Sequence, residues 1–108
     1  MSGEEPPPEA PEAPTGLEAS AGDSEVSLSW NPSFSADEYF IYRQEGFSGA
    51  ELIGSTSDVS FIDDQVFNGT EYCYYVVASN VSGDSGASSQ VCATPEGPPP
   101  LYLSLIHI

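Results

Sequence analysis

The sequence GTEYCYYVVASN at residues 69–80, followed by VSGDSG at residues 81–86, decides the fold of this chain. Tyrosine, valine and alanine occupy alternate positions from 72 to 78. Successive side chains of a β-strand point to opposite faces of a sheet, so this alternation predicts a strand at 70–80 with one buried face. The glycines and polar residues after Asn80 predict a hairpin loop, and therefore an antiparallel neighbour for this strand.

Six further short stretches show a similar pattern, and turn-forming residues bound them. They lie at residues 17–19, 26–30, 39–43, 51–54, 59–63 and 87–93. No segment shows sustained helical periodicity, and Pro and Gly recur too often for a helix. The chain is therefore predicted to be all-β, with seven strands in an antiparallel sandwich. The side chains expected to face its core are Val26, Leu28, Trp30, Tyr39, Ile41, Val59, Phe61, Tyr72, Tyr74, Val76 and Ala78.

Acidic residues dominate the charge of the chain. It has 17 Asp and Glu against a single basic residue, Arg43, for a formal net charge of −16. Binding to nucleic acid or to anionic lipid depends on basic side chains, so both are excluded as partners. Two explanations of the acidity stay open: it keeps the protein soluble, or it adapts the protein to high salt, where screening relieves the self-repulsion of the folded state.

Proline-rich segments flank the predicted strands. Residues 1–13 alternate Pro with Glu and Ala and are expected to form an acidic linker before one folded domain at 14–95. Residues 96–108 comprise a second Pro-rich linker and the apolar octapeptide LYLSLIHI. This octapeptide is either the start of a following domain or non-native sequence, and the second origin is favoured. It is too short to span a membrane, so no membrane insertion is expected.

In order and spacing, the strand motifs resemble the fibronectin type III module. The residues that carry the resemblance are Pro14 with Leu17, Val26-x-Leu28-x-Trp30, Tyr39-x-Ile41-Tyr42-Arg43, Phe61-x-Asp63 and the stretch from Gly69 to Ser85. The resemblance implies an immunoglobulin-like β-sandwich from a secreted or cell-surface multidomain protein. Trp30 is then expected to be the core anchor. Tyr72 resembles the tyrosine corner of such sandwiches, whose hydroxyl bonds to nearby backbone.

The two cysteines, Cys73 and Cys92, are expected to form a disulfide. With the hairpin centred between Ser82 and Gly83, the numbers of opposed residues sum to 165, which places the two cysteines opposite each other on the outer face. Metal ligation and a reactive thiol are the alternatives. A disulfide implies an oxidising compartment, hence an extracellular or cell-surface location. No signal-peptide pattern is visible, so we expect the chain to be part of a longer exported protein.

An exposed aromatic patch is the candidate contact face. If Tyr72 and Tyr74 point inward, Tyr75 and Val77 point outward beside Phe40 and Tyr42 of the neighbouring strand. We call Phe40, Tyr42, Tyr75 and Val77 the outer aromatic face. It suits a protein, a sugar or a neighbouring module. The alternative is ordinary cross-strand pairing of aromatic side chains, with no partner.

Three other kinds of site were considered. Asn68 and Asn80 each begin a glycosylation sequon. Asp58, Asp63 and Asp64 lack the spacing of a calcium loop, so a solvated acidic rim is expected in place of a metal site. The predicted domain contains no histidine, phosphate-binding loop or nucleophile elbow, so no catalytic residue and no cofactor are expected.

These observations predict a non-catalytic extracellular module. It would act as a spacer or presentation domain with weak protein or glycan contacts, in a secreted multidomain enzyme such as a hydrolase or in a surface protein. The alternative function is an adhesive or receptor-type recognition domain that uses the outer aromatic face. The expected partners are neighbouring domains of the same chain, and the module itself is expected to be a monomer.

Overall fold

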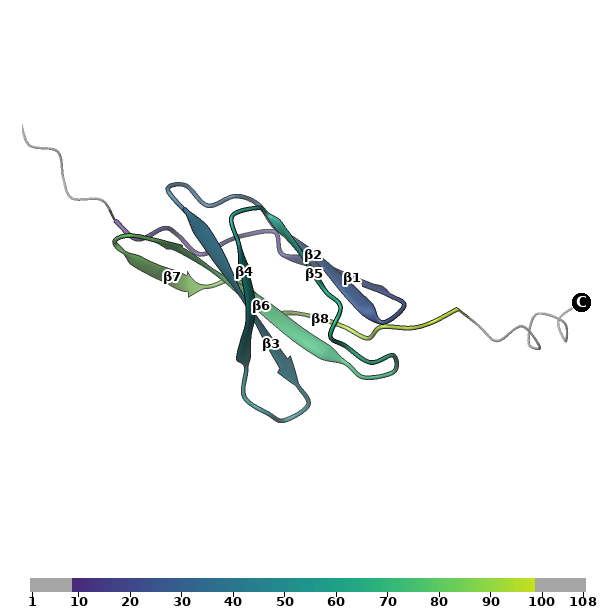
Figure 1. The fold of residues 1–108 in the computed structure, drawn as a ribbon. Helices are drawn as coiled ribbons and strands as arrows, with labels where there is room; N and C mark the ends of the chain where they lie inside the picture. Colours follow the sequence, from purple (N-terminus) through teal and green to yellow (C-terminus); the bar gives the residue numbers. More distant parts are fainter. Residues whose placement is uncertain (1–8, 99–108) are drawn as a thin grey trace, which may run out of the picture.

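The computed structural model of the protein describes residues 9–98, which form two packed antiparallel sheets (Figure 1). Sheet A has the order β1–β2–β5, and sheet B has the order β4–β3–β6–β7, with β8 also paired to β6. The strands are β1 (Glu18–Gly22), β2 (Glu25–Ser29), β3 (Glu38–Glu45), β4 (Glu51–Thr56), β5 (Ser60–Asp63), β6 (Tyr72–Asn80), β7 (Gly83–Ala87) and β8 (Val91–Ala93). The predicted all-β, immunoglobulin-like sandwich is therefore confirmed.

The described residues contain eight strands where seven were expected. β7 occupies residues 83–87, most of which were expected to belong to the hairpin loop, and the stretch expected as one strand at 87–93 is interrupted. Ser88 lies in the interruption, where its amide N donates to the Val76 carbonyl oxygen at 2.9 Å. Its hydroxyl oxygen accepts from the Val76 amide N, also at 2.9 Å. A side-chain oxygen thus takes the place of a partner strand's carbonyl, and the regular ladder stops until β8 begins.

The core lies between the two sheets and follows the predicted alternation. All the expected core residues are buried except Phe61, which is partly buried against the core, and Val59, which is 37% exposed. The expectation for Val59 was wrong: its carbonyl oxygen still accepts from Trp30 N at 3.0 Å just before β5, but its side chain is not part of the core cluster. Leu17 and Val66, from segments outside the strands, complete the buried cluster.

Trp30 belongs to this cluster. It is 5% exposed and meets the Tyr39 ring edge to face, with the ring centroids 5.5 Å apart. The hydroxyl of Tyr39 accepts a hydrogen bond from the Ser33 amide N at 2.9 Å. This position fits the expected core anchor, since a large aromatic side chain buries much apolar area.

The two ends of the described chain leave the domain at opposite ends of the sandwich (Figure 1). At the first end, Nδ2 of Asn80 donates to the carbonyl oxygen of Glu9 at 2.8 Å, and Pro11 is buried. Contacts with the sandwich thus begin upstream of the expected domain start at residue 14. At the other end, Gly69 N donates to the buried Pro95 carbonyl oxygen at 2.9 Å, and Glu96 N donates to Gly22 O at 3.1 Å.

The expected apolar octapeptide at 101–108 lies outside the described residues. Within residues 9–98, we find no helix that is both long and apolar enough to cross a membrane.

Candidate functional site

The four residues of the outer aromatic face lie together on the outside of sheet B. In the register of β3 and β6, Tyr42 is opposite Tyr75 and Phe40 is opposite Val77. All four are partly buried, and Leu52 of β4, opposite Tyr42, is 54% exposed beside them. The sheet therefore presents a continuous apolar surface across three strands.

The rings of Tyr42 and Tyr75 stack on each other, and this limits what the face can recognise. Their centroids are 4.8 Å apart and their planes differ by 9°. Each ring turns one flat side toward the other, as in stabilising cross-strand pairs. This arrangement supports an apolar protein contact better than a flat aromatic platform for a sugar ring.

The disulfide between Cys73 and Cys92 is confirmed. The two residues are directly opposed in the register of β6 and β8, with their Cα atoms 3.9 Å apart. The bridge joins the strand that decides the fold to the last described strand. It closes the loop that contains all of β7.

The side chain of Tyr72 lies in the core and bonds to backbone. It is 1% exposed, and its hydroxyl oxygen accepts a hydrogen bond from the amide N of Phe67 at 3.0 Å. This geometry is that expected of a tyrosine corner. The guanidinium carbon of Arg43 lies 5.4 Å from the centroid of the Tyr72 ring, within the range of a cation–π contact.

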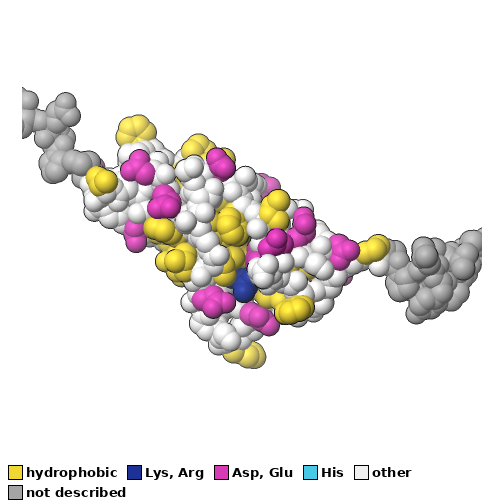
Figure 2. All heavy atoms as spheres, in the orientation of Figure 1, with side chains coloured by type: hydrophobic (Ala, Val, Ile, Leu, Met, Phe, Trp, Pro, Cys, Tyr) yellow, Lys and Arg dark blue, Asp and Glu magenta, His cyan; other side chains and the backbone are white. Residues whose placement is uncertain are grey.

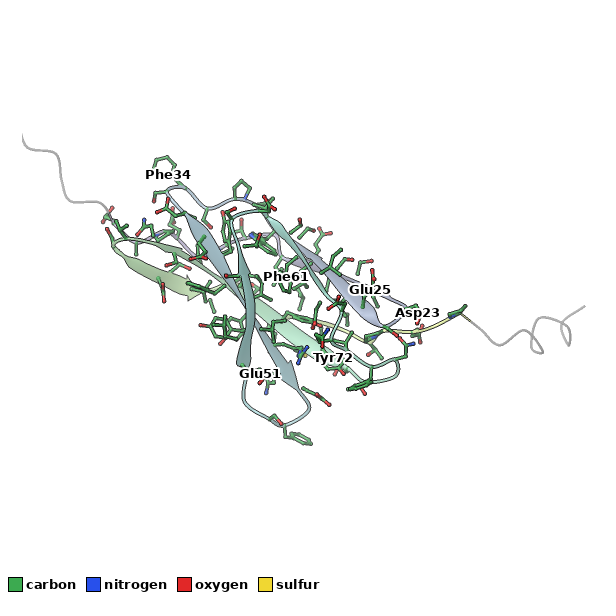
Figure 3. All side chains as sticks on the ribbon, in the orientation of Figure 1. Asp23, Glu25, Phe34, Glu51, Phe61 and Tyr72 are labelled. Carbon is green, nitrogen blue, oxygen red and sulfur yellow. A yellow bond between two sulfur atoms is a disulfide. The ribbon has the colours of Figure 1, made fainter. Side chains whose placement is uncertain are left out.

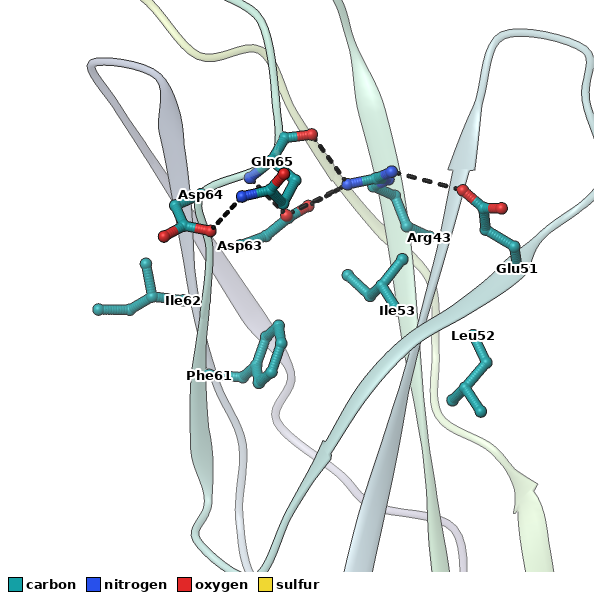
Figure 4. Close-up of a pocket in the computed structure, with 9 residues that line it drawn as sticks. All are labelled: Arg43, Glu51, Leu52, Ile53, Phe61, Ile62, Asp63, Asp64 and Gln65. Atoms are coloured by element: carbon teal, nitrogen blue, oxygen red, sulfur yellow. Dashed lines mark hydrogen bonds and ion pairs between the residues drawn. The ribbon is translucent and has the colours of Figure 1, made fainter.

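A charged cluster joins the two sheets, and it corrects one expectation from the sequence. Asp63 was expected on a solvated rim, but its side chain is 3% exposed. Its carboxylate accepts from Nη1 of Arg43 at 3.0 and 3.2 Å (Figure 4). It also accepts from the hydroxyl of Tyr74 at 2.7 Å. Arg43 and Tyr74 belong to sheet B and Asp63 to sheet A, so these contacts link the layers. Asp58 and Asp64 are exposed, as expected.

Arg43 is held from several sides. Its Nη1 also donates to the backbone oxygen of Gln65 at 3.2 Å, and its Nη2 donates to Glu51 at 3.4 Å. Burial lowers the pKa of Arg43, but the hydrogen bond and charge of Asp63, together with smaller contributions from Tyr74 and Glu51, raise the pKa above its usual value. The chain's single basic side chain is therefore committed to internal contacts.

Tyr74 is held in its neutral form. Burial raises the pKa of its phenol far above the usual value, and the hydrogen bond and negative charge of Asp63 raise it further. A phenolate here would be buried next to a carboxylate, which explains the direction of the shift. The Tyr74 hydroxyl can therefore serve as a hydrogen-bond donor across the whole physiological pH range.

The alternation of the sequence contained a signal for this cluster. Tyr39, Ile41 and Arg43 occupy alternate positions of β3, so Arg43 falls on the buried face. Phe61 and Asp63 are likewise two residues apart in β5. Two opposite charges placed on facing inner surfaces would each be costly alone, and pairing removes most of that cost.

The two sequon asparagines both make structural contacts. Asn68 accepts from the amide N of Ser24 at 2.8 Å, and its Nδ2 donates to Asp23 at 2.9 Å. Nδ2 of Asn80 donates to Glu9 O and to Ser35 O, at 2.8 and 3.0 Å. A glycan is attached at Nδ2, so its attachment would replace one hydrogen of an atom that already donates hydrogen bonds in this structure. Their use as glycosylation sites remains a prediction.

No metal site is found in the described part of the chain. Across residues 9–98, no group of three or more His, Cys, Asp or Glu side chains is placed to hold a metal ion.

Comparisons with known proteins show that this sequence is similar to short segments of longer enzymes. No family model matches the chain. It is 35% identical over 92 residues to an amylopullulanase of Thermoanaerobacterium thermosulfurigenes, a match that covers 82% of this chain and 5% of the relative. It is 39% identical over 88 residues to a poly(3-hydroxybutyrate) depolymerase of Ralstonia pickettii, with 80% and 17% covered. An exoglucanase B of Cellulomonas fimi is 34% identical over 92 residues, with 81% and 8% covered. The chain thus spans less than a fifth of the length of each of these relatives.

Two solved structures that have the same arrangement are covered almost completely by this chain. A Fn3-like protein from Clostridium thermocellum superposes with a TM-score of 0.69 at 25% identity, covering 84% of this chain and 97% of that one. The fibronectin type-III domain of a human fibronectin type III domain containing protein superposes with a TM-score of 0.72 at 24% identity, covering 86% and 93%.

Proposed function

We propose that this chain, which has the fibronectin type III fold, is a non-catalytic accessory module that acts as a spacer or presentation domain in a larger protein. It resembles short segments of multidomain hydrolases, namely an amylopullulanase, a depolymerase and an exoglucanase. In each of these relatives the matched segment is a small part of the whole. A fold is not itself a function, so the proposal rests on the geometry of this domain.

The single observation that carries the proposal is that both ends of the domain are fastened, at opposite ends of the sandwich (Figure 1). The incoming segment is held by Asn80 at Glu9, and the outgoing segment is held through Pro95 and Glu96. A spacer needs a defined length and direction, and hydrogen bonds at entry and exit reduce the freedom of the adjoining linkers. The sequence beyond both ends is rich in Pro, the composition typical of semi-rigid spacers.

The disulfide supports an extracellular or cell-surface setting. Disulfides persist in oxidising compartments and are rare in reducing ones. The Cys73–Cys92 bridge joins two strands of the same sheet, so it serves the stability of a small domain with little core.

A recognition role for the outer aromatic face is the second candidate. It is favoured by the exposed Leu52 beside Tyr42 and Tyr75, which extends the apolar area to the edge of sheet B. A contact of this kind would dock a neighbouring domain of the same protein or a partner protein.

Two measurements separate these functions. In the first, a fluorescent protein is fused to each end of the full chain, and single-molecule energy transfer reports the distance between them. We expect one narrow distribution, which Asn80→Ala broadens because it releases Glu9. Gln90→Ala, which removes only a side-chain contact to Gln44 on the outer face, should leave it unchanged. Equal widths in all three proteins would contradict the spacer function.

In the second, the full chain is screened against glycan and protein arrays. If the module is a spacer, we expect no binding signal on either array that the double variant Tyr42→Ser with Tyr75→Ser loses. A defined affinity that the double variant loses would overturn the spacer function in favour of recognition.

A further inference from the structure

One dipeptide of this chain is able to change its own covalent structure. Asn68 is followed by Gly69, whereas the other two asparagines, Asn31 and Asn80, are followed by proline and valine. The backbone nitrogen of the next residue can attack the side-chain amide of an asparagine. The attack is easiest when that residue is glycine, which has no side chain in the way and a permissive backbone. Asn68 is therefore the asparagine of this chain that is most prone to lose its amide.

Asn68 lies where three segments meet, at the end of the sandwich from which the chain leaves. Its Oδ1 accepts from the amide N of Ser24 at 2.8 Å, and its Nδ2 donates to Asp23 at 2.9 Å. Asp23 and Ser24 form the turn between β1 and β2, beside the outgoing chain (Figure 3). We call residues 95–97 the exit segment. A Cβ added to Gly97 would lie 3.3 Å from Nδ2 of Asn68, so the exit segment runs past the same amide.

The backbone nitrogen that would attack Asn68 is also one that fastens the exit segment. Gly69 N donates to the carbonyl oxygen of Pro95 at 2.9 Å. Attack requires this nitrogen to give up its hydrogen and to bond to Cγ of Asn68, so the hydrogen bond to Pro95 must break first. Asn68 and Gly69 are both exposed, and nothing lies within 4 Å of a Cβ added to Gly69, so water has access to the dipeptide. The folded domain thus protects a dipeptide that the sequence makes reactive.

We propose that Asn68 is a deamidation site whose reaction unfastens the exit segment, and that the fastened exit segment slows the reaction. The nitrogen of Gly69 loses its proton and bonds to Cγ of Asn68, while the bond from Cγ to Nδ2 breaks and ammonia leaves with that proton. The product is a cyclic imide. Water then adds to one of its two carbonyl carbons and opens the ring, which yields aspartate or isoaspartate. Water is the co-reactant, and nothing is oxidised or reduced.

Each product loses a contact that holds the outgoing chain. In the aspartate, a carboxylate oxygen replaces the Nδ2 group that lies 2.9 Å from Asp23, so a hydrogen bond becomes a repulsion between like charges. In the isoaspartate, the main chain gains one carbon between residues 68 and 69. This insertion displaces the Gly69 nitrogen from the carbonyl oxygen of Pro95.

The chain has no spare cation that could offset the new negative charge. Its single Lys or Arg side chain is Arg43, which already bonds to Asp63 and Glu51. Figure 2 shows this basic side chain recessed among acidic ones. The importance of a released exit segment for a spacer rests on the proposed function, but the reaction and the release do not.

The first test follows the reaction in the full chain. The protein is kept in warm, mildly alkaline buffer, with and without urea, and each asparagine is followed by mass spectrometry of its peptides. We expect conversion of Asn68 in both, and slower conversion in the folded protein, where the bond to Pro95 must open first. Asn80 and Asn31 are internal controls, because valine hinders the attack and a proline nitrogen has no hydrogen to lose.

Three results of this test would overturn the proposal. They are an Asn68 that stays intact in the folded protein, conversion of Asn80 as fast as that of Asn68, and equal rates at Asn68 with and without urea.

A variant tests whether the folded contacts slow the reaction. Asp23→Ala frees Nδ2 of Asn68 and should speed its conversion in the folded protein about fivefold, the effect of one lost hydrogen bond. In urea the variant should react like the original protein. Asp64→Ala, at an exposed acid that bonds to Gln65, is the matched control and should change neither rate. Equal folded-state rates in Asp23→Ala and the original protein would refute the protective role.

Release of the exit segment is tested separately with a mimic of the product. Asn68→Asp places a like charge beside Asp23, and NMR measures hydrogen exchange at the amides of Gly69 and Glu96, which make the two backbone hydrogen bonds that fasten the exit segment. We expect both amides to exchange about fivefold faster. Asn68→Asp with Asp23→Asn should restore slow exchange, because the amide of residue 23 can donate to the new carboxylate. The amide of Ser88, bonded within sheet B, is the control and should not change.

Unchanged exchange at Gly69 and Glu96 in the single variant would overturn the unfastening, and so would a double variant that does not recover. These amides report on the exit segment alone and not on the distance between the ends of the chain. A failure of this inference is therefore distinguishable from a failure of the spacer function.

Discussion

The hydroxyl of Tyr74 donates a 2.7 Å hydrogen bond to the carboxylate of Asp63, inside the core and between the two sheets. The same carboxylate binds Arg43, so one acidic side chain is shared by two donors from the other layer. An ion pair in this position costs desolvation, and its full set of hydrogen bonds offsets that cost. The cluster therefore links the two sheets by hydrogen bonds.

Replacing Asp63 should destabilise the protein far more than replacing an exposed acidic residue. Asp63→Ala leaves the Arg43 guanidinium without its main partner and the Tyr74 hydroxyl without an acceptor. We expect a loss of about 3–5 kcal/mol in the free energy of unfolding, as for other broken buried pairs. Urea denaturation of both proteins measures it. Asp64→Ala, the exposed neighbour, should change stability by less than about 0.5 kcal/mol, and equal effects would refute the buried role.

Stability should fall at alkaline pH because of Tyr74. Its pKa is raised in the folded state, so the contribution is fully present below the unfolded pKa of about 10. Above that pH the unfolded chain releases the phenolic proton while the folded chain keeps it. The free energy of unfolding then falls by up to about 1.4 kcal/mol per pH unit.

Tyr74→Phe should remove this part of the alkaline slope, although it weakens the protein at neutral pH. Tyr75→Phe, on the outer face, is the matched variant and should keep the slope. Denaturant midpoints measured from neutral to strongly alkaline pH decide between them. The same slope in both variants would show that Tyr74 is not the responsible group.

Tyr72→Phe should cost on the order of 1 kcal/mol, the usual net value of one hydrogen bond. The hydroxyl oxygen accepts from Phe67 N, and the variant would leave that amide without its partner. The measurement is the denaturation midpoint, with Tyr42→Phe as the control on the outer face. A midpoint unchanged from the original protein would argue against the tyrosine corner.

Gly54→Ala should destabilise through the Phe61 ring. An added Cβ at residue 54 would lie 2.8 Å from two carbons of the Phe61 ring, so the ring must move. Figure 3 labels Phe61. Overpacking of this kind costs typically about 1–3 kcal/mol. Gly49→Ala is the control, since nothing lies within 4 Å of its added Cβ. Thermal melting compares them, and equal melting temperatures would mean that the ring moves freely.

The buried face of the sandwich could be predicted from the sequence because it depends on a local rule. Side chains alternate across a strand, so Tyr72, Tyr74 and Val76 fell correctly on one face. The outer aromatic face followed from the same rule, which placed Tyr42 and Tyr75 together once the strands were paired. The prediction for Val59 was wrong because alternation does not say how far along a strand the core extends.

The prediction that Cys73 lies opposite Cys92 was correct, although the predicted position of the hairpin turn was wrong. The turn lies at Val81 and Ser82, with Asn80 opposite Gly83, one residue earlier than expected. Irregularities between β6 and its partners then restore the register by Cys73 and Cys92. They arise where serine hydroxyls bond to backbone amides, as Ser88 does at Val76. Hydrogen bonds in which a side chain replaces a backbone group do not follow the alternation of a strand, so the sequence pattern does not reveal them.

The inter-sheet cluster was missed for a different reason. The composition suggested that charges belong at the surface, which holds for most acidic residues of this chain. Alternation placed Arg43 and Asp63 on inner faces, but only the contact between two sheets shows that these charges meet. A contact between layers depends on how the sheets pack, and that is decided by the whole core.

The Cys73–Cys92 bond also determines how this domain responds to a pulling force. The covalent path from one end of the chain to the other runs through the bond and bypasses the loop between the cysteines, whose sequence separation is 19. A fully extended chain gains about 3.3–3.6 Å per residue, so the bond shortens the unfolded length by roughly 60–70 Å. In a protein under tension, the redox state of the surroundings would set the greatest length to which this domain can be drawn.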